Sequence, residues 1–145
     1  ELAANRFPVD GKPIRLSDIR VPMFVVGTEA DHVAPWHSVY KTGNLVRSDD
    51  YSFLLTAGGH NAGIVCGPVH PKRHYRLLTR RLADPHLAPQ EWMDAAPRFE
   101  GAWWPAWADW LAQRSSSRVK PPALGGKAKA YQAIDDAPGQ YVRQR

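Results

Sequence analysis

Asp31 and His60 are the two residues of this chain whose types and positions fit a carboxylate–histidine pair. Asp31 closes the stretch GTEAD at residues 27–31, and His60 follows two glycines in the stretch LLTAGGHN at residues 54–61. A carboxylate that holds one ring nitrogen of a histidine fixes the tautomer and leaves the other nitrogen to act as a general base. The two glycines let the backbone turn sharply and aim the ring. The pattern therefore predicts a general-base site.

Each of the two candidates follows a segment that has the character of a buried strand. Residues 19–27 (IRVPMFVVG) and 51–57 (YSFLLTA) are almost wholly apolar, as is typical of strands covered on both faces in a parallel sheet. Between them, apolar residues recur at helical spacing, namely Trp36, Val39, Tyr40 and Leu45. Strand, helix and strand in this order form a βαβ unit. Because the carboxyl ends of parallel strands meet at one edge of a sheet, Asp31 and His60 are expected within hydrogen-bond distance if the two strands are neighbours.

The remaining sequence predicts further elements of an α/β domain and then a tail. Residues 70–82 (HPKRHYRLLTRRL) fit either an alternating strand or a short basic helix, and residues 89–97 (PQEWMDAAP) fit a short helix. A clearer helix is predicted within residues 103–114 (WWPAWADWLAQR). The face of this helix that is expected to pack on the sheet consists of Trp104, Trp107, Trp110 and Leu111. We assign residues 1–114 to the folded domain and residues 115–145, which are basic and contain Pro and Gly, to a carboxyl-terminal tail.

Composition and charge narrow the class of protein. The 145 residues are 43% hydrophobic and 23% charged, which is typical of a globular chain. The net charge of +5 gathers in residues 115–145, which hold six Lys/Arg against two Asp, so nucleic-acid binding is not predicted. The longest apolar run, at residues 21–26, is far shorter than the roughly 20 residues of a membrane span. The single cysteine, Cys66, cannot form an internal disulfide and fits a reducing compartment.

Three further residues have a spacing that superficially suggests zinc. Cys66, His70 and His74 recur at intervals of four, but Pro71 interrupts regular helical geometry and no fourth ligand is evident. We therefore expect no metal.

A nucleophile for the Asp31–His60 pair is not recognisable in the chain. Triads of α/β-hydrolases run nucleophile, acid and histidine along the sequence, and the pair supplies the last two members in that order. No Gly-x-Ser-x-Gly or Gly-x-Cys-x-Gly elbow occurs in the 145 residues. Cys66 lacks the flanking glycines and is a better candidate for a small buried hydrophobe. Because the chain begins with Glu1, we expect the nucleophile in an upstream part of a longer polypeptide.

Both candidates and their neighbours also have structural interpretations. Asp31 fits a cap for the helix that follows it, and His60 alone would fit a solvated loop residue. His32, Trp36 and Asn61 are further candidates for a substrate pocket, although Trp36 equally fits packing at the start of a helix.

Three stretches in this order resemble the carboxyl-terminal part of the polyhydroxyalkanoate synthases, also called poly(3-hydroxybutyrate) polymerases. They are VGTEADHVAPWHSVYK (26–41), FLLTAGGHNAGIV (53–65) and GAWWPAWADWL (101–111), and DAPGQYV (136–142) extends the similarity into the tail. The resemblance is to the long class I type. Three separate motifs make it much more specific than a lone Gly-Gly-His.

The resemblance implies the carboxyl-terminal portion of an α/β-hydrolase domain, with parallel strands, crossover helices and a Cys-His-Asp triad. The aspartate of the family motif D-H-x-x-P-W corresponds to Asp31, and the histidine of G-G-H-N corresponds to His60. The family's catalytic cysteine elbow and its cap region lie upstream of these motifs, so this chain by itself is expected to be inactive. The implied activity is an acyltransferase that polymerises (R)-3-hydroxyacyl-CoA into polyester and releases CoA.

The resemblance also implies partners and a location. They are acyl-CoA and the growing polyester chain, a homodimer in the full-length enzyme and the surface of polyester granules in the cytoplasm, with no cofactor besides the substrate. The alternatives are a thioesterase or esterase of the same fold, which would share the Asp–His pair, and a non-catalytic accessory protein of granules. We further expect an unpaired, apolar strand edge, which would make the isolated chain oligomeric or poorly soluble.

Overall fold

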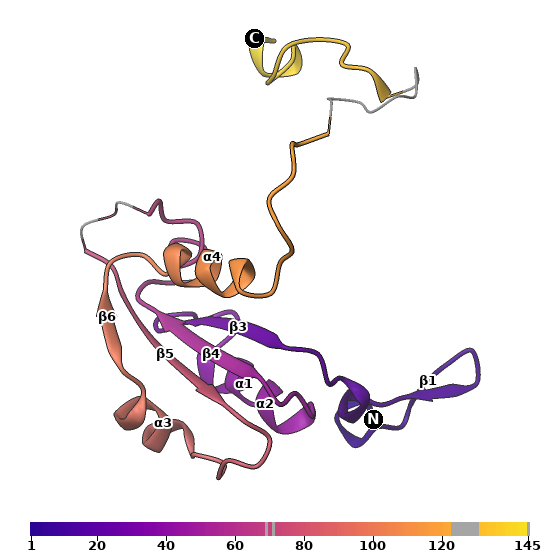
Figure 1. Cartoon of the computed structure of the whole chain (residues 1–145), viewed down its shortest axis with the longest axis vertical. Helices are drawn as coiled ribbons and strands as arrows, with labels where there is room; N and C mark the ends of the chain where they lie inside the picture. The colour runs from indigo at the N-terminus through magenta and orange to yellow at the C-terminus, as the bar shows by residue number, and fades with distance from the viewer. Residues whose placement is uncertain (69, 71, 123–130, 145) are drawn as a thin grey trace. The chain divides into compact units, whose positions relative to one another are not determined.

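The computed structural model describes residues 1–68, 70, 72–122 and 131–144. The chain divides into two compact units, Glu1–Gln113 and Arg114–Arg145, and the first unit holds both sheets and the four α-helices (Figure 1). Pro71 and residues 123–130 of the predicted tail lie outside the described residues. Within the described part, no helix combines the length and the apolar character needed to cross a membrane.

The predicted βαβ unit is present. Strands β3 (Met23–Thr28) and β4 (Tyr51–Thr56) pair in parallel, and the connection between them contains α1 (Trp36–Tyr40) and α2 (Thr42–Leu45). The single helix expected between the strands is thus two short helices that meet at Lys41. Both strands and the helical crossover are confirmed.

The sheet continues beyond β4 with antiparallel strands. The order is β3-β4-β5-β6, in which β5 (His74–Arg80) and β6 (Arg98–Glu100) each run antiparallel to the preceding strand. The ambiguous segment at residues 70–82 therefore forms a strand over His74–Arg80. The prediction of parallel strands with crossover helices is correct for β3 and β4 and wrong for the rest, because antiparallel neighbours need no helical crossover. The architecture is a mixed α/β sheet.

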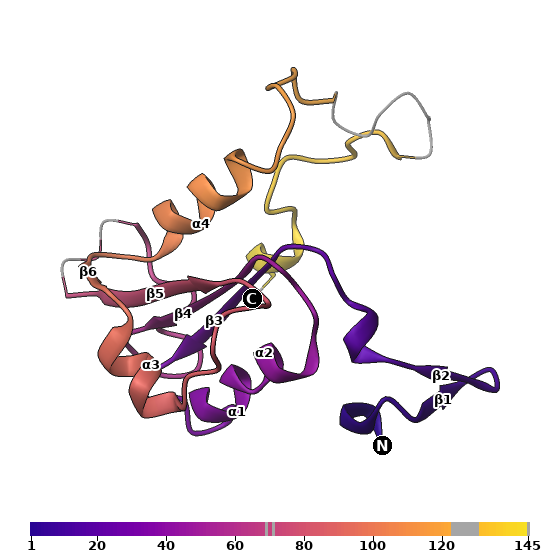
Figure 2. The same ribbon diagram turned by 60° about the horizontal axis from the view of Figure 1, so that its bottom comes forward.

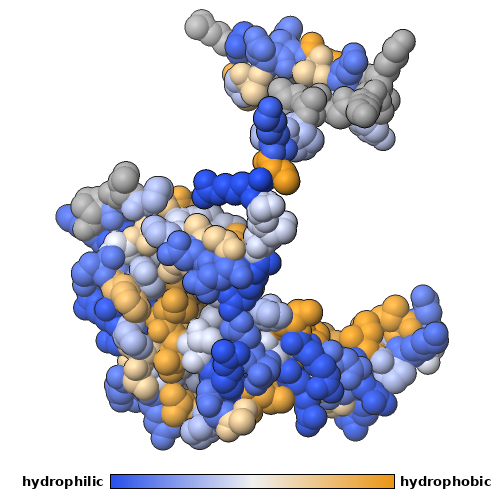
Figure 3. All heavy atoms as spheres, in the orientation of Figure 1, coloured by the Kyte–Doolittle hydropathy of each residue, from blue (hydrophilic) through white to orange (hydrophobic). Residues whose placement is uncertain are grey.

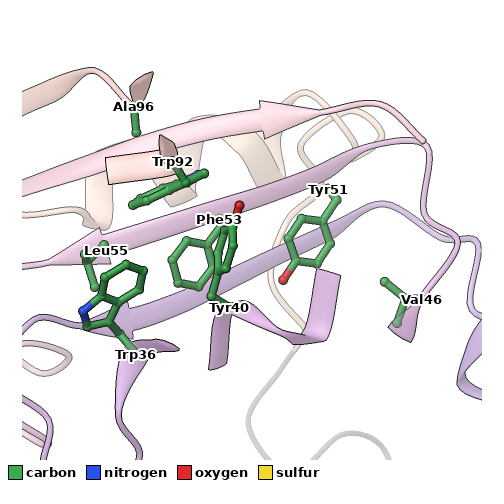
Figure 4. Close-up of a cluster of buried hydrophobic side chains, with 8 residues drawn as sticks. All are labelled: Trp36, Tyr40, Val46, Tyr51, Phe53, Leu55, Trp92 and Ala96. Atoms are coloured by element: carbon green, nitrogen blue, oxygen red, sulfur yellow. The ribbon is translucent and has the colours of Figure 1, made fainter. Parts of the chain in front are cut away.

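A cluster of buried aromatic and aliphatic side chains fills one side of the sheet (Figure 4). It comprises Trp36, Tyr40, Val46, Tyr51, Phe53, Leu55, Trp92 and Ala96. Alternate residues of β4 point into it, and α3 (Pro89–Ala95), which confirms the helix predicted at residues 89–97, supplies Trp92. The Phe53 ring lies 4.9 Å from Trp92 and 5.1 Å from Tyr40, centroid to centroid. Every residue of β4 is buried, as the apolar run predicts.

Helix α4 (Trp104–Ala112) lies on the opposite side of the sheet from α1, α2 and α3 (Figure 2). Trp110 packs edge-on against Phe24 of β3, with ring centroids 5.6 Å apart. The predicted helix is confirmed, but none of its residues is fully buried, and Leu111 is 38% exposed. The indole that is buried is that of Trp103, which precedes the helix and is 5% exposed. Of the face predicted to pack on the sheet, the three tryptophans are partly buried and Leu111 is exposed.

An amino-terminal hairpin was not predicted. Strands β1 (Phe7–Val9) and β2 (Lys12–Ile14) are joined at Asp10 and Gly11, whose φ angles of 48° and 74° suit a tight hairpin turn. The apolar side chains of the hairpin are almost half exposed and form hydrophobic surface on the face shown in Figure 3.

The outer edge of β3 is unpaired within the described part of the chain. β3 has β4 as its neighbour on one side, and its first four residues are only partly buried. An apolar strand with one open edge is the feature expected from the sequence.

Candidate active site

Parallel pairing of β3 and β4 places the carboxyl ends of both strands side by side. The pairing continues into the loops, because the N–H of Glu29 donates to the Thr56 carbonyl and the N–H of Ala30 donates to the Gly58 carbonyl, both at 3.0 Å. The loops that carry the two candidate residues therefore start from the same edge of the sheet.

Asp31 and His60 are in contact at this edge. Nδ1 of His60 lies 3.1 Å from Oδ1 and 3.0 Å from Oδ2 of Asp31. An ionised carboxylate can only accept, so Nδ1 carries the proton and Nε2 is the ring nitrogen able to take another. Within the described part of the chain Nε2 has no hydrogen-bond partner, and the His60 side chain is 45% exposed against 9% for Asp31. The predicted contact is confirmed, and the catalytic role of the pair stays a prediction.

The Asp31 carboxylate also organises the loop that precedes α1. Its Oδ1 accepts the backbone N–H groups of Val33 at 2.9 Å and Ala34 at 2.8 Å. The bond from Ala34 does most to lower the pKa of Asp31 from 3.8 to about 2; partial burial opposes it, and His60 and Val33 lower it further. The N-cap of α1 is Pro35 and has no side-chain cap, so Asp31 orders the loop and does not cap the helix directly.

The loop that carries His60 depends on its glycines. Gly58 has a φ of +113°, a conformation that residues with a side chain rarely adopt. The N–H of Gly63 donates to the Gly59 carbonyl at 3.1 Å, which closes the turn around His60. A Cβ added to Gly63 would lie 2.6 Å from Cγ2 of Thr28, so the loop packs tightly on the end of β3. The sharp glycine turn predicted before His60 is present.

The other predicted site residues lie in different surroundings. His32 and Asn61 are exposed beside the pair, and within the described part of the chain their side chains make no hydrogen bond. Their role as substrate contacts stays a prediction. Trp36 is 9% exposed, belongs to the core cluster and stacks on His37 with ring centroids 3.9 Å apart. The packing role considered for Trp36 is thereby confirmed.

A second carboxylate–histidine pair lies at the same edge and was missed. Nε2 of His74 is 3.0 Å from Oε1 and 3.2 Å from Oε2 of Glu29. Antiparallel pairing brings the start of β5, where His74 lies, beside the end of β4. Glu29 follows β3 directly, so its place at this edge of the sheet could be predicted from the sequence. The place of His74 could not, because it depends on the direction of β5.

The three residues with zinc-like spacing have separate partners. The Cys66 thiol is buried and donates to the Gly63 carbonyl at 3.6 Å, and His74 pairs with Glu29. Nδ1 of His70 accepts the backbone N–H of Lys72 at 3.4 Å. Among the residues that the structure describes, no group of three or more possible metal ligands lies together.

The chain is similar over nearly its whole length to curated polyester-forming enzymes. It is 36% identical over 141 residues to the poly(3-hydroxyalkanoate) polymerase subunit PhaC of Cupriavidus necator, covering 97% of this chain and 23% of that protein. It is 37% identical over 139 residues to poly(3-hydroxyalkanoate) polymerase 2 of Ectopseudomonas oleovorans, covering 94% and 23%. It is 35% identical over 144 residues to the subunit PhaC of Rhizobium etli, covering 99% and 22%. The chain thus spans less than a quarter of the length of these relatives. No protein-family model matches it.

Proposed function

Because this chain belongs to the poly(3-hydroxyalkanoate) polymerases, we propose that it supplies the acid and the base of a Cys-His-Asp triad in a polyester-forming acyltransferase. The observation that carries the proposal is the contact of His60 Nδ1 with Asp31, which leaves Nε2 as the ring nitrogen that can accept a proton, on a side chain that is 45% exposed. The nucleophilic cysteine would come from a part of the polypeptide outside these residues.

In this proposal the first unit is the carboxyl-terminal portion of an α/β-hydrolase catalytic domain. The parallel β3–β4 pair, with helices on both faces and the Asp–His pair at the carboxyl ends, supports this assignment. The unpaired edge of β3 offers the place where further parallel strands of the same sheet would add.

Acylation would use both residues of the pair. Nε2 of His60 takes the thiol proton while the cysteine sulfur attacks the thioester carbon of an (R)-3-hydroxyacyl-CoA. The bond from that carbon to the CoA sulfur breaks, the departing thiolate recovers the proton from Nε2, and the acyl group stays on the cysteine. Asp31 orients the ring and stabilises the imidazolium, which it can do because its low pKa keeps it ionised.

Elongation would repeat the proton transfer on a hydroxyl group. The 3-hydroxyl oxygen of one acyl unit attacks the thioester carbon of another while Nε2 of His60 takes the hydroxyl proton. An ester bond forms, the carbon–sulfur bond breaks, and the leaving thiolate receives the proton from Nε2. Asp31 is a poor candidate for this base, since a carboxylate with a pKa of about 2 holds a proton weakly.

The family also guides the proposal for partners and location. We propose acyl-CoA and the growing polyester as substrates, with no cofactor besides them. We further propose a homodimer of the full-length enzyme at the surface of polyester granules in the cytoplasm.

The test uses the complete gene product that carries this chain, supplied with (R)-3-hydroxybutyryl-CoA. CoA release is followed with a thiol reagent, and polymer is weighed after extraction. We expect His60→Ala to lower both signals about 10²–10⁴-fold, the usual contribution of a general base. His86→Ala, which removes an exposed histidine elsewhere on the surface, is the matched control and should retain both.

Each other outcome has a defined meaning. Wild-type CoA release without polymer would replace the polymerase proposal with a thioesterase of the same fold. Neither product from the wild type would favour a non-catalytic granule protein, and unchanged rates in His60→Ala would refute the role of the pair.

A further inference from the structure

The His60 loop, residues 57–63, leaves the end of β4 and turns back on itself. Arg73 reaches across this loop with both ends of its guanidinium. Nη1 donates to the Ala57 carbonyl at 3.0 Å, and Nη2 donates to the Ala62 carbonyl at 2.9 Å. The two carbonyls lie on either side of His60 in the chain, so a single rigid group sets the distance between the two arms of the loop.

Arg73 is itself held in place by the main chain. It directly precedes β5, and its carbonyl accepts the N–H of Gly101 at 2.6 Å. The Ala57 arm of the loop is already tied to β5, because the N–H of Ala57 donates to the His74 carbonyl at 2.9 Å. Arg73 therefore connects the second arm to a part of the sheet that is fixed.

The second arm packs on the end of β3 through Gly63 but has few other hydrogen bonds to the rest of the domain. Trp103 donates its indole N–H to the Gly63 carbonyl at 3.2 Å, and Arg73 holds Ala62 one residue earlier. The glycines that permit the turn also raise its conformational freedom, and the half-exposed His60 ring is not fixed by burial. Restraint of the ring against Asp31 must therefore come largely from the loop backbone.

The environment of Arg73 does not favour an explanation by stability alone. In the described part of the chain it forms no ion pair with a carboxylate, and its Nε is buried without a hydrogen-bond partner. A buried donor without an acceptor costs free energy of folding. The hydrogen bonds to the two loop carbonyls are thus the interactions that explain a guanidinium at this position.

We propose that Arg73 is a positioning residue, which holds the His60 loop so that Nδ1 of His60 stays on Asp31 and Nε2 points toward the reacting proton. This inference rests on the proposed function for its catalytic consequence, whereas its geometric part concerns only the loop. Arg73 acts through backbone carbonyls and touches no reacting atom.

The test compares Arg73→Met with Arg76→Met in the complete gene product. Arg76 lies in β5, three residues after Arg73, and is a matched control because it also donates to a backbone carbonyl, that of Ala96 at 2.7 Å, but on the side of α3. We expect Arg73→Met to lower kcat about 10–100-fold with little change in KM, since small misplacements of a catalytic group are costly in rate. Arg76→Met should keep kcat.

Two further readouts separate positioning from general stability. The proton on Nδ1 of His60, observed by NMR as a hydrogen-bonded imidazole signal, should broaden or vanish in Arg73→Met and persist in Arg76→Met. Free guanidinium should restore part of the rate of Arg73→Ala, and Arg73→Lys should restore little because one ammonium cannot bridge both carbonyls as a planar fork does.

A wild-type kcat together with an intact His60 signal in Arg73→Met would overturn the inference. Equal losses of kcat and thermal stability in Arg73→Met and Arg76→Met would also overturn it. Failure of the proposed function is distinguishable, because it would show as undiminished activity in His60→Ala, and the NMR signal of His60 does not depend on that activity.

Discussion

Ala34 donates its backbone N–H to Oδ1 of Asp31 over 2.8 Å, so the carboxylate that faces His60 also orders the loop before α1. One side chain thus has a local structural role and a long-range partner. The two roles respond differently to substitution, which allows them to be separated by experiment.

Asp31→Asn should abolish activity while leaving the loop ordered. An asparagine keeps an oxygen for the N–H groups of Val33 and Ala34 but cannot hold the Nδ1 proton of His60 with a charge. We expect about a 10⁴-fold loss of kcat, as for the same change in a serine protease triad, with a small change in Tm. Asp31→Ala should lose activity and lower Tm further. Equal Tm values for both variants would contradict the structural role, and wild-type kcat in Asp31→Asn would contradict the catalytic one.

The stability of the folded chain should depend on pH through Asp31. Its pKa is about 2 in the folded state against an ordinary value of 3.8, so the unfolded state binds the proton first as pH falls. The stabilisation is therefore complete well above pH 3.8 and is lost between about pH 4 and pH 2. Denaturant titrations should show the gap between wild type and Asp31→Asn narrowing over this window. A gap that stays constant down to about pH 2 would show that the pKa of Asp31 is not lowered by folding.

Gly58→Ala should destabilise the His60 loop by more than the strain of placing an alanine at a positive φ. The added Cβ would collide with the Arg73 guanidinium and with the backbone of Gly63, at a φ of +113°. Gly101→Ala is the control, because its φ of +97° is similar and no atom lies within 4 Å of the new Cβ. We expect a cost of about 1–3 kcal/mol for the control, measured by denaturant unfolding, and a larger one for Gly58→Ala. Equal losses of unfolding free energy in Gly58→Ala and Gly101→Ala would show that the Arg73 side chain moves away from the new Cβ without loss of stability.

The 145-residue chain by itself should self-associate. The outer edge of β3 presents unpaired backbone groups in the described structure, and an open apolar edge recruits further strands. Light scattering coupled to size exclusion should give an oligomer or aggregate for the chain alone and a defined species for the complete gene product. A monomeric chain with a sharp, reversible unfolding transition would contradict this prediction.

The sequence was sufficient for the features that depend on local pattern. Apolar runs at residues 19–27 and 51–57 predicted β3 and β4, because a strand covered on both faces favours apolar residues along its whole length. The helical spacing between them implied a crossover, and a crossover makes two strands parallel. Parallel strands place their carboxyl ends together, so the contact of Asp31 with His60 was expected once the two strands were taken as neighbours, and their pairing confirms that they are.

The direction and partners of the later elements were decided by tertiary structure. Residues 70–82 have a pattern that suits a strand or a helix, and pairing with the buried strand β4 selected the strand. That choice brought His74 to Glu29 and Arg73 to the His60 loop. Neither contact has a signature in sequence spacing, because the partners lie on different elements and meet only through the register of β4 with β5.

The sequence by itself therefore determined the β3–β4 unit, which follows from periodicity, and indicated the Asp–His pair through the positions behind the two strands and the family motifs around them. Tertiary structure decided how the His60 loop is held, which indole is buried and which histidine finds a second carboxylate. These outcomes depend on hydrogen bonds and packing between segments that are distant in the sequence. The chain adopts the arrangement of lowest free energy among the possible ones, and a local sequence pattern does not contain that information.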